Sequence, residues 1–268
     1  MNVSVHPLVP NAVLPSGAPA ATRLHVPSGY GVQEQCLPFT AAAAAGLLIH
    51  APFGFGFCRP EELPAGVRAF TSPRRDPSRE ISRVFYVRDE PASRFERNAF
   101  RLYPIPFRDA EGRLREHSAV QPGLSFFDRL DQADLFKLHL PYVLRTPGAI
   151  DSLFTAPINR PGPLPVVSGL VETEWYAHPV NLVLRCPEER SVHVAAGDVV
   201  AQVVFVPRQA RDARLRVVAF DSAEGRAQQD DLLRWYAQHA ADRSAYKKLA
   251  RSRHGRIELD PGRTPSPD

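Results

Sequence analysis

The run of apolar and β-branched residues from Val194 to Pro207, VAAGDVVAQVVFVP, constrains the fold more than any other part of the sequence. Valine-rich runs of this kind favour a strand that is buried on both of its faces. The one polar interruption, Gly197-Asp198, is typical of a tight turn that leads into such a strand. We therefore expect a sheet to be built around this run.

The run belongs to a block of strand-like segments between residues 165 and 220. Five candidates occur there: PVVSGLVETEW, PVNLVLRC, RSVHVA, DVVAQVVFVP and RLRVVAF. Residues 81–145 add ISRVFYV, AFRLYPIPF, GLSFF and LFKLHLPYVL, separated by turn-rich segments at irregular spacing. Short strands between such turns are typical of a sandwich or barrel. The sequence thus predicts a mainly β protein.

The two ends of the chain have a different character. Residues 1–30 are rich in proline and poor in large apolar side chains, which predicts an extended or disordered arm. A broken apolar stripe at helical spacing follows the β-type segments. We expect a β-rich domain over 31–220, a C-terminal helix over 226–254 packed on or beside it, and a disordered tail over 257–268.

Composition excludes several classes of protein. Of the 268 residues, 44% are hydrophobic and 23% are charged, as in ordinary globular proteins. The net charge of +4 comes from arginines interspersed among acids, so it does not favour nucleic-acid binding, which needs a clustered basic stripe with aromatics. Three cysteines without paired spacing argue against a disulfide framework or a zinc ribbon.

The sequence shows no targeting or membrane segment. The N-terminal MNVSVHPLVP lacks the basic and apolar regions of a signal peptide, and no apolar window reaches the length of a membrane span. We therefore expect a cytoplasmic protein that does not contact a membrane. A homo-oligomer stays open at this point.

The segment from Gly169 to Pro207 resembles the dUTPases. GLVETEW is similar to the glycine, apolar, apolar, acid hairpin of that family, and GDVVAQ is similar to its closing strand. The resemblance implies a β-clip or dUTPase-like fold, or a distorted barrel. It also implies that Glu172 stands at the place of the catalytic aspartate and Trp175 at that of the aromatic residue under the sugar. Arg145-Thr146 is a partial counterpart of the family's Arg-Ser motif.

The chemistry of the dUTPases is not matched. Hydrolysis of a nucleoside triphosphate needs positive charge and a metal ion at the phosphates. The family's glycine-rich C-terminal arm carries an aromatic residue, whereas this chain has none after Tyr246. PVNLVLRC also lacks the glutamate that related deaminases place in this strand. We expect the scaffold without dUTP hydrolysis or dCTP deamination.

A longer resemblance covers most of residues 36–246. CLPF, HLPYVLRTPG, GLVETEW and WYAQHAADRSAY, in this order, resemble an uncharacterised bacterial family, domain of unknown function 6065. This chain departs from the family in having Asn159-Arg160 where an Asn-Trp pair is expected, and Glu174 where aspartate is commoner. The resemblance implies no activity.

Two segments, 139–148 and 169–178, hold the candidate site residues. His139 is polar among apolar residues, so it is either a hydrogen-bonded core residue or a site residue. Arg145 lies an even number of positions further along and could share its face, where the two could clamp a carboxylate or phosphate. Glu172 and Glu174 are two residues apart and would share a face of an extended segment.

The two glutamates have alternative roles. They could pair with Arg145 or Arg185, or they could hold a metal ion. Glu174 with two histidines would imitate a two-histidine, one-carboxylate iron site, although the spacing is not diagnostic. The histidines that would serve as metal ligands are His139, His178 and His193. The sequence does not determine a cofactor.

The leading hypothesis is that the protein binds a small anionic or nucleotide-like molecule between these two segments, as an enzyme of specialised metabolism would. The candidate catalytic residues are Glu172, Arg145 and His139. The candidate ligand-binding residues are Trp175, Glu174, His178 and Tyr142. One alternative is an iron-dependent, cupin-like oxygenase or lyase. Another is a non-catalytic interaction module that uses the basic end of the C-terminal helix.

Overall fold

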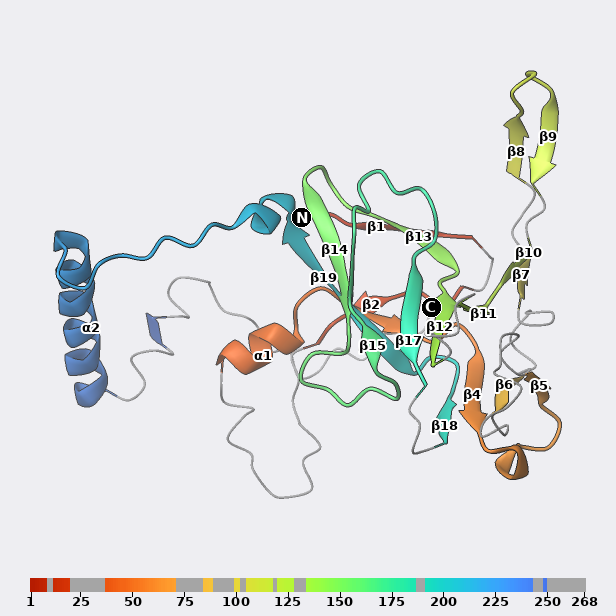
Figure 1. The fold of residues 1–268 in the computed structure, drawn as a ribbon, viewed down its shortest axis with the longest axis horizontal. Helices are drawn as coiled ribbons and strands as arrows, with labels where there is room; N and C mark the ends of the chain where they lie inside the picture. Colours follow the sequence, from red (N-terminus) through yellow and green to blue (C-terminus); the bar gives the residue numbers. More distant parts are fainter. Residues whose placement is uncertain are drawn as a thin grey trace, which may run out of the picture. The chain divides into compact units, whose positions relative to one another are not determined.

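The structure is a computed structural model, and it describes residues 1–8, 12–19, 37–70, 84–88, 99–101, 105–117, 120–127, 134–186, 191–242 and 248–249 (Figure 1). Within these residues the protein is mainly β, with antiparallel sheets and one long helix, as the sequence predicts. The strands of each described sheet form an open order with two edges. The chain divides into two compact units, Met1–Ala210 and Arg211–Asp268, each of which is described by itself.

The elements of the first unit begin with β1 (Ser4–Pro7), β2 (Ser16–Gly17), α1 (Leu37–Ala43), β3 (Leu47–His50), β4 (Gly54–Cys58), η2 (Pro60–Glu62), β5 (Arg68–Phe70), β6 (Val84–Arg88), β7 (Ala99–Arg101), β8 (Ile105–Arg108), β9 (Leu114–His117) and β10 (Val120–Pro122). They continue with β11 (Leu124–Phe126), β12 (Leu135–His139), β13 (Tyr142–Arg145), β14 (Ile150–Thr155), β15 (Val166–Val167), β16 (Gly169–Val171), β17 (Asn181–Arg185), β18 (Val192–Val194) and β19 (Val199–Pro207), and η4 (Arg208–Asp212) crosses the boundary between the two units. The second unit holds α2 (Ala223–Ala241).

The valine-rich run that ends at Pro207 contains β19, the central strand of a five-stranded sheet with the order β16-β14-β19-β3-β2. A tight turn precedes it, as predicted. Gly197 adopts a φ of 89°, which favours glycine, and the carboxylate of Asp198 accepts a hydrogen bond of 2.8 Å from the backbone N–H of Ala195. Because β19 has a paired neighbour on each side, its apolar side chains can be buried on both faces.

A second sheet, β11-β12-β17-β15, covers the core with one face. In β12 the alternate residues Phe136 and Leu138 are fully buried in the core, whereas Lys137 and His139 alternate with them on the other face. The sheet β18-β4-β6-β5 contributes the phenylalanines of GFGFC, and the ring of Phe55 packs edge-on against that of Phe136 at 6.1 Å. The core therefore lies between sheets, where aromatic contacts are favourable.

The N-terminal arm is extended where the structure describes it, and it takes part in the fold. β1 pairs with β13, and β2 pairs with β3. Val3 and Val5 pack against the main core cluster. The proline-rich composition therefore predicted the extended conformation but not these pairings. Proline does not prevent them, because edge strands tolerate it.

The C-terminal part departs from the prediction in one segment. RLRVVAF, predicted as a strand, forms no strand, and Leu215 within it is 91% exposed. A strand needs a partner for its backbone groups, and the structure assigns none to this segment among the described residues. The predicted tail over 257–268 lies outside the described residues.

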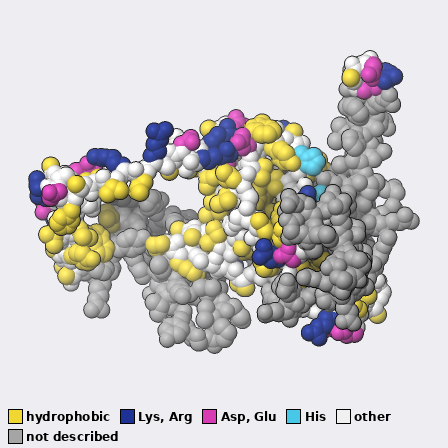
Figure 2. All heavy atoms as spheres, viewed as in Figure 1, with side chains coloured by type: hydrophobic (Ala, Val, Ile, Leu, Met, Phe, Trp, Pro, Cys, Tyr) yellow, Lys and Arg dark blue, Asp and Glu magenta, His cyan; other side chains and the backbone are white. Residues whose placement is uncertain are grey.

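Helix α2 confirms the predicted C-terminal helix. It begins after Ser222, whose hydroxyl accepts a hydrogen bond from the backbone N–H of Gly225 in the manner of an N-cap. Figure 2 shows hydrophobic side chains gathered on this helix. The exposed ones are Leu232, Leu233, Trp235 and Tyr236. No helix within the described ranges combines the length and apolar character needed to cross a bilayer.

The pairing of β1 leads to a stability prediction. Changing Val3 and Val5 together to serine should lower the free energy of unfolding by about 1–3 kcal/mol, because both side chains pack on the core. Changing Ser4 and His6 together to alanine is the matched control, since both are exposed and should cost about 0.5 kcal/mol or less. Urea denaturation measures both. Equal losses in the two variants would show that the arm does not pack as described.

Candidate functional site

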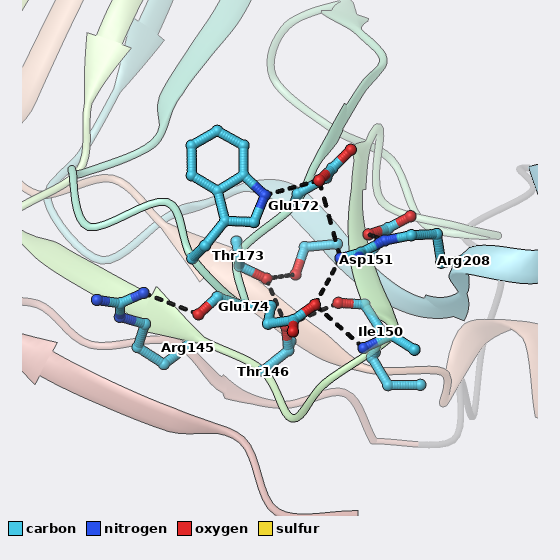
Figure 3. Close-up of polar contacts among 11 residues, drawn as sticks. Arg145, Thr146, Ile150, Asp151, Glu172, Thr173, Glu174 and Arg208 are labelled. Atoms are coloured by element: carbon cyan, nitrogen blue, oxygen red, sulfur yellow. Dashed lines mark hydrogen bonds and ion pairs between the residues drawn. The ribbon is translucent and has the colours of Figure 1, made fainter.

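The turn at residues 172–175 follows the edge strand β16 directly, and a chain of buried hydroxyls holds it in place (Figure 3). The Thr146 hydroxyl donates a hydrogen bond to the carbonyl of Ile150 at 2.8 Å, so it must accept from Thr173 at 2.9 Å. Thr173 in turn accepts from Ser152 at 2.6 Å. Thr173 and Ser152 are both fully buried. The chain joins the turn to β14 and to the end of β13.

Arg208, the first residue after β19, gathers the acids of this region. Its guanidinium donates to Glu174 at 2.7 Å and to Asp151 at 3.2 Å, and it lies 3.9 Å from the carboxylate of Glu172. Asp151 is fully buried in β14, where a carboxylate needs a cationic partner to offset its lost hydration. Glu172 and Glu174 both face Arg208, but they do so from a turn rather than from one face of an extended segment.

The charges of this cluster favour one another. The pKa of Glu174 is lowered because its carboxylate accepts hydrogen bonds from the backbone N–H of Ala149 and from Arg208, an effect that outweighs partial desolvation and the nearby charge of Glu172. The pKa of Arg208 is raised by its hydrogen bonds with Glu174 and Asp151. Both groups therefore stay charged at neutral pH.

Arg145 and Trp175 also meet at this turn. The guanidinium of Arg145 donates to the backbone carbonyl of Glu174 at 2.9 Å, and no second acceptor for it occurs among the described residues. The indole of Trp175 is 63% exposed, and its N–H donates to the carboxylate of Glu172 at 2.6 Å. The exposed ring thus belongs to the turn, and the guanidinium of Arg145, at the end of β13, contacts the backbone of the residue just before it.

Arg145 and Glu172 were expected to hydrogen-bond to each other or to share one pocket. The contacts run through the turn instead: Arg145 bonds to the backbone of Glu174, and Glu172 bonds to Trp175. Arg185, the other proposed partner of the glutamates, pairs with Asp134 at 3.1 Å. The glutamates are therefore neutralised from the end of β19 rather than from β13 or β17.

His139 lies in a different environment from Arg145. It is 7% exposed, and its Nε2 lies 2.8 Å from the hydroxyl of Ser125. Desolvation lowers the pKa of His139 to about 4, helped by the charges of Lys137 and His178 and opposed by the neighbouring amide of Asn181. The imidazole is therefore neutral at pH 7.

The remaining candidates do not gather with the turn in the way the sequence suggested. Tyr142 is 1% exposed in the core, where burial raises the pKa of its hydroxyl, so its ring is covered by protein. The Nδ1 of His178 lies 2.9 Å from the carbonyl of Pro179. His193 is exposed on β18 and contacts the hydroxyl of Tyr86. Across the described ranges, no three of His, Cys, Asp and Glu are grouped so that they could hold a metal ion.

The sequence analysis missed Arg208, Asp151 and Thr173. Arg208 had a usable signal, since it follows Pro207 at the end of the strongest predicted strand. Asp151 stands in the segment IDSLFT, which was not recognised as a strand. Its alternation of apolar and polar residues resembles that of many solvent-facing strands, so nothing local marks the carboxylate as buried.

Comparisons with family models, curated proteins and solved structures found no match to this chain. The resemblances to the dUTPases and to domain of unknown function 6065 therefore stay predictions. Any function must be argued from the site itself.

The ion cluster predicts that replacing Arg208 lowers the stability of the protein strongly. Changing Arg208 to methionine should lower the melting temperature by about 5–10 °C, because the buried carboxylate of Asp151 loses its cation. Arg214→Met is the matched control, since Arg214 is exposed and its loss should leave the melting temperature nearly unchanged. Differential scanning calorimetry on both variants makes the comparison. A similar shift in the two would contradict the role given to Arg208.

The low pKa of His139 predicts a pH-dependent stability. The folded protein binds this proton only near pH 4, whereas the unfolded chain binds it below about 6.5. The resulting stability is present above pH 6.5 and is lost as the pH falls toward 4. The melting temperature of the wild type should therefore fall more between pH 7 and pH 5 than that of His139→Gln. Parallel curves for the two proteins would refute the assignment.

Proposed function

We propose that the turn at residues 172–175 binds a small anionic, nucleotide-like ligand. The observation that carries the proposal is the contact of Arg145, which has a single acceptor among the described residues, with the turn backbone at Glu174, next to the exposed Trp175. A planar ring can stack on an exposed indole, as bases do on aromatic side chains. A guanidinium binds a phosphate or carboxylate through two parallel hydrogen bonds.

The charges around the turn limit the size of the anion. Arg208 is already engaged by Asp151 and Glu174, so it contributes little positive charge to a ligand. Arg145 is then the cation that remains for the ligand in the described cluster. One guanidinium matches one phosphate or carboxylate group, which favours a monophosphate over a triphosphate. One available guanidinium is also too little positive charge for a triphosphate, which supports the expectation that the protein does not hydrolyse dUTP.

The contacts of Glu172 favour a role in ligand recognition over a role as the general base that activates water. Its carboxylate holds the indole N–H of Trp175 and faces Arg208 at 3.9 Å, which fixes the orientation of the ring. A fixed ring loses less conformational entropy when a ligand stacks on it. The iron-enzyme alternative lacks support from the described residues, because no three of His, Cys, Asp and Glu among them are grouped as metal ligands would be.

A fluorescence titration tests the proposal. Trp175 and Trp235 are the two tryptophans of the chain, so Trp235→Phe leaves Trp175 as the reporter. Uridine and adenosine monophosphates should quench its emission saturably, whereas inorganic phosphate alone should bind weakly because it cannot stack. Arg145→Gln should weaken nucleotide binding by about tenfold or more, since a charge-assisted hydrogen bond contributes about 1.5–3 kcal/mol.

The matched control is Arg185→Gln. Arg185 is a strand-end arginine like Arg145, but it pairs with Asp134 and its side chain is 57% exposed. This variant should bind the nucleotides as the parent protein does. A flat titration for every nucleotide, or equal binding by Arg145→Gln and its parent, would refute the proposed site. Release of pyrophosphate from dUTP, lost in Glu172→Gln, would show instead that the chemistry of the dUTPases is present.

A further inference from the structure

We propose that Ser125, His139 and Asn181 form a second site, which hydrolyses small carboxylic esters with Ser125 as the nucleophile. The three residues come from neighbouring strands, β11, β12 and β17. They do not belong to the turn at residues 172–175, and the proposal does not depend on ligand binding there.

The site lies on the face of the sheet that points away from the core. Leu124, Leu138 and Leu182 are buried in the main core cluster, so their neighbours in each strand point to the opposite face. Ser125, His139 and Asn181 are those neighbours. Ser125 and Asn181 are partly exposed, whereas the imidazole between them is 7% exposed. A substrate can therefore reach the hydroxyl while the base stays shielded from bulk water.

The contacts have the order that nucleophilic catalysis by serine requires. The Ser125 hydroxyl lies 2.8 Å from Nε2 of His139. Asn181 stands directly opposite His139 in the pairing of β12 with β17, so its amide lies on the same face as the imidazole, where it can orient the ring. A nucleophile bonded to a base, with a third group that orients the base, is the general arrangement of serine and cysteine hydrolases.

Lys137 supplies positive charge beside the nucleophile. It lies directly opposite Ser125 in the pairing of β11 with β12, and residues in such positions have Cβ atoms about 4.5–5.5 Å apart. Its ammonium stands 4.5 Å from the centre of the Phe127 ring. A fixed cation there can stabilise the oxyanion that forms when an ester carbonyl is attacked. The apolar ring offers a contact for the acyl or alcohol part of the ester.

The reaction uses water as its co-reactant. The Ser125 oxygen bonds to the ester carbonyl carbon while its proton moves to Nε2 of His139. The carbon–oxygen bond to the alcohol then breaks, and the alcohol leaves with that proton. Water attacks the acyl-serine and gives a proton to His139, the bond from the acyl carbon to Ser125 breaks, and the proton returns to the serine oxygen. The products are a carboxylic acid and an alcohol.

The neutral state of His139 at pH 7 supports its role as the base and predicts how esterase activity depends on pH. Lys137 and His178 are the charged or titratable groups that act on the imidazole, and with burial they lower its pKa to about 4. The imidazole is thus neutral and able to accept a proton at pH 7, although its weak basicity predicts slow turnover. An exposed histidine that attacked esters by itself would lose its activity near pH 6.5 instead.

Covalent labelling of the intact protein tests the proposal. A fluorophosphonate probe, which modifies nucleophilic serines, should add to Ser125, with the site mapped by peptide mass spectrometry of the wild-type chain. Labelling and hydrolysis of p-nitrophenyl acetate should be lost in Ser125→Ala and fall at least tenfold in His139→Gln. Ser191→Ala is the matched control, because Ser191 is partly exposed and bonded to the carboxylate of Glu62 rather than to an imidazole.

The wild-type protein alone can overturn the proposal, whether or not the variants fold. Absence of the probe from Ser125 in the folded wild-type chain would refute it. Esterase activity with a midpoint near pH 6.5 would also refute it, whereas activity that persists to about pH 5 is the expected result. If His139→Gln folds and is labelled at the wild-type rate, the hydrogen bond between Ser125 and His139 is structural and the site is not catalytic.

Discussion

The pairing of β19 on both of its sides is the constraint on which the rest of the first unit depends. Val200, Ala201 and Val203 are fully buried there, and so is Gln202 between them. A buried amide is costly unless its groups are bonded, and Gln202 accepts from the N–H of Ile158 at 2.8 Å and donates to the carbonyl of Ala45 at 2.6 Å. The strand thereby fixes the chain after α1 as well as its neighbours in the sheet.

The candidate ligand site depends on the far end of the same strand. Arg208 follows β19 and holds the carboxylates of Asp151 and Glu174, so the position of the strand decides where the turn at residues 172–175 lies. The buried carboxylate of Asp151 thus has its cation within the cluster, while the exposed ring of Trp175 faces away from the core and can meet a ligand. Stability and recognition thus use different atoms of one cluster, which is how a rigid site is usually supported.

Much of the fold was predictable because its signals are local. The valine-rich run, the Gly197-Asp198 turn and the alternation of β12 each fix an element within a few residues. Glu172 and Trp175 could likewise be singled out from their own segment. The partners could not be predicted, because strand pairing depends on contacts that are distant in sequence. Arg208 meets residues 34 and 57 positions earlier, and Ser125 meets His139 only through the register of a hairpin.

The central claim is that the Trp175 indole, held by Glu172, forms the ligand-facing surface of the first unit. The indole N–H resonances of the two tryptophans in a ¹H–¹⁵N NMR spectrum test it most directly. The Trp175 resonance should move when Glu172 is changed to glutamine and should shift progressively as a nucleoside monophosphate is added, while the Trp235 resonance stays in place. A Trp175 resonance that responds neither to the substitution nor to the nucleotide would contradict the account.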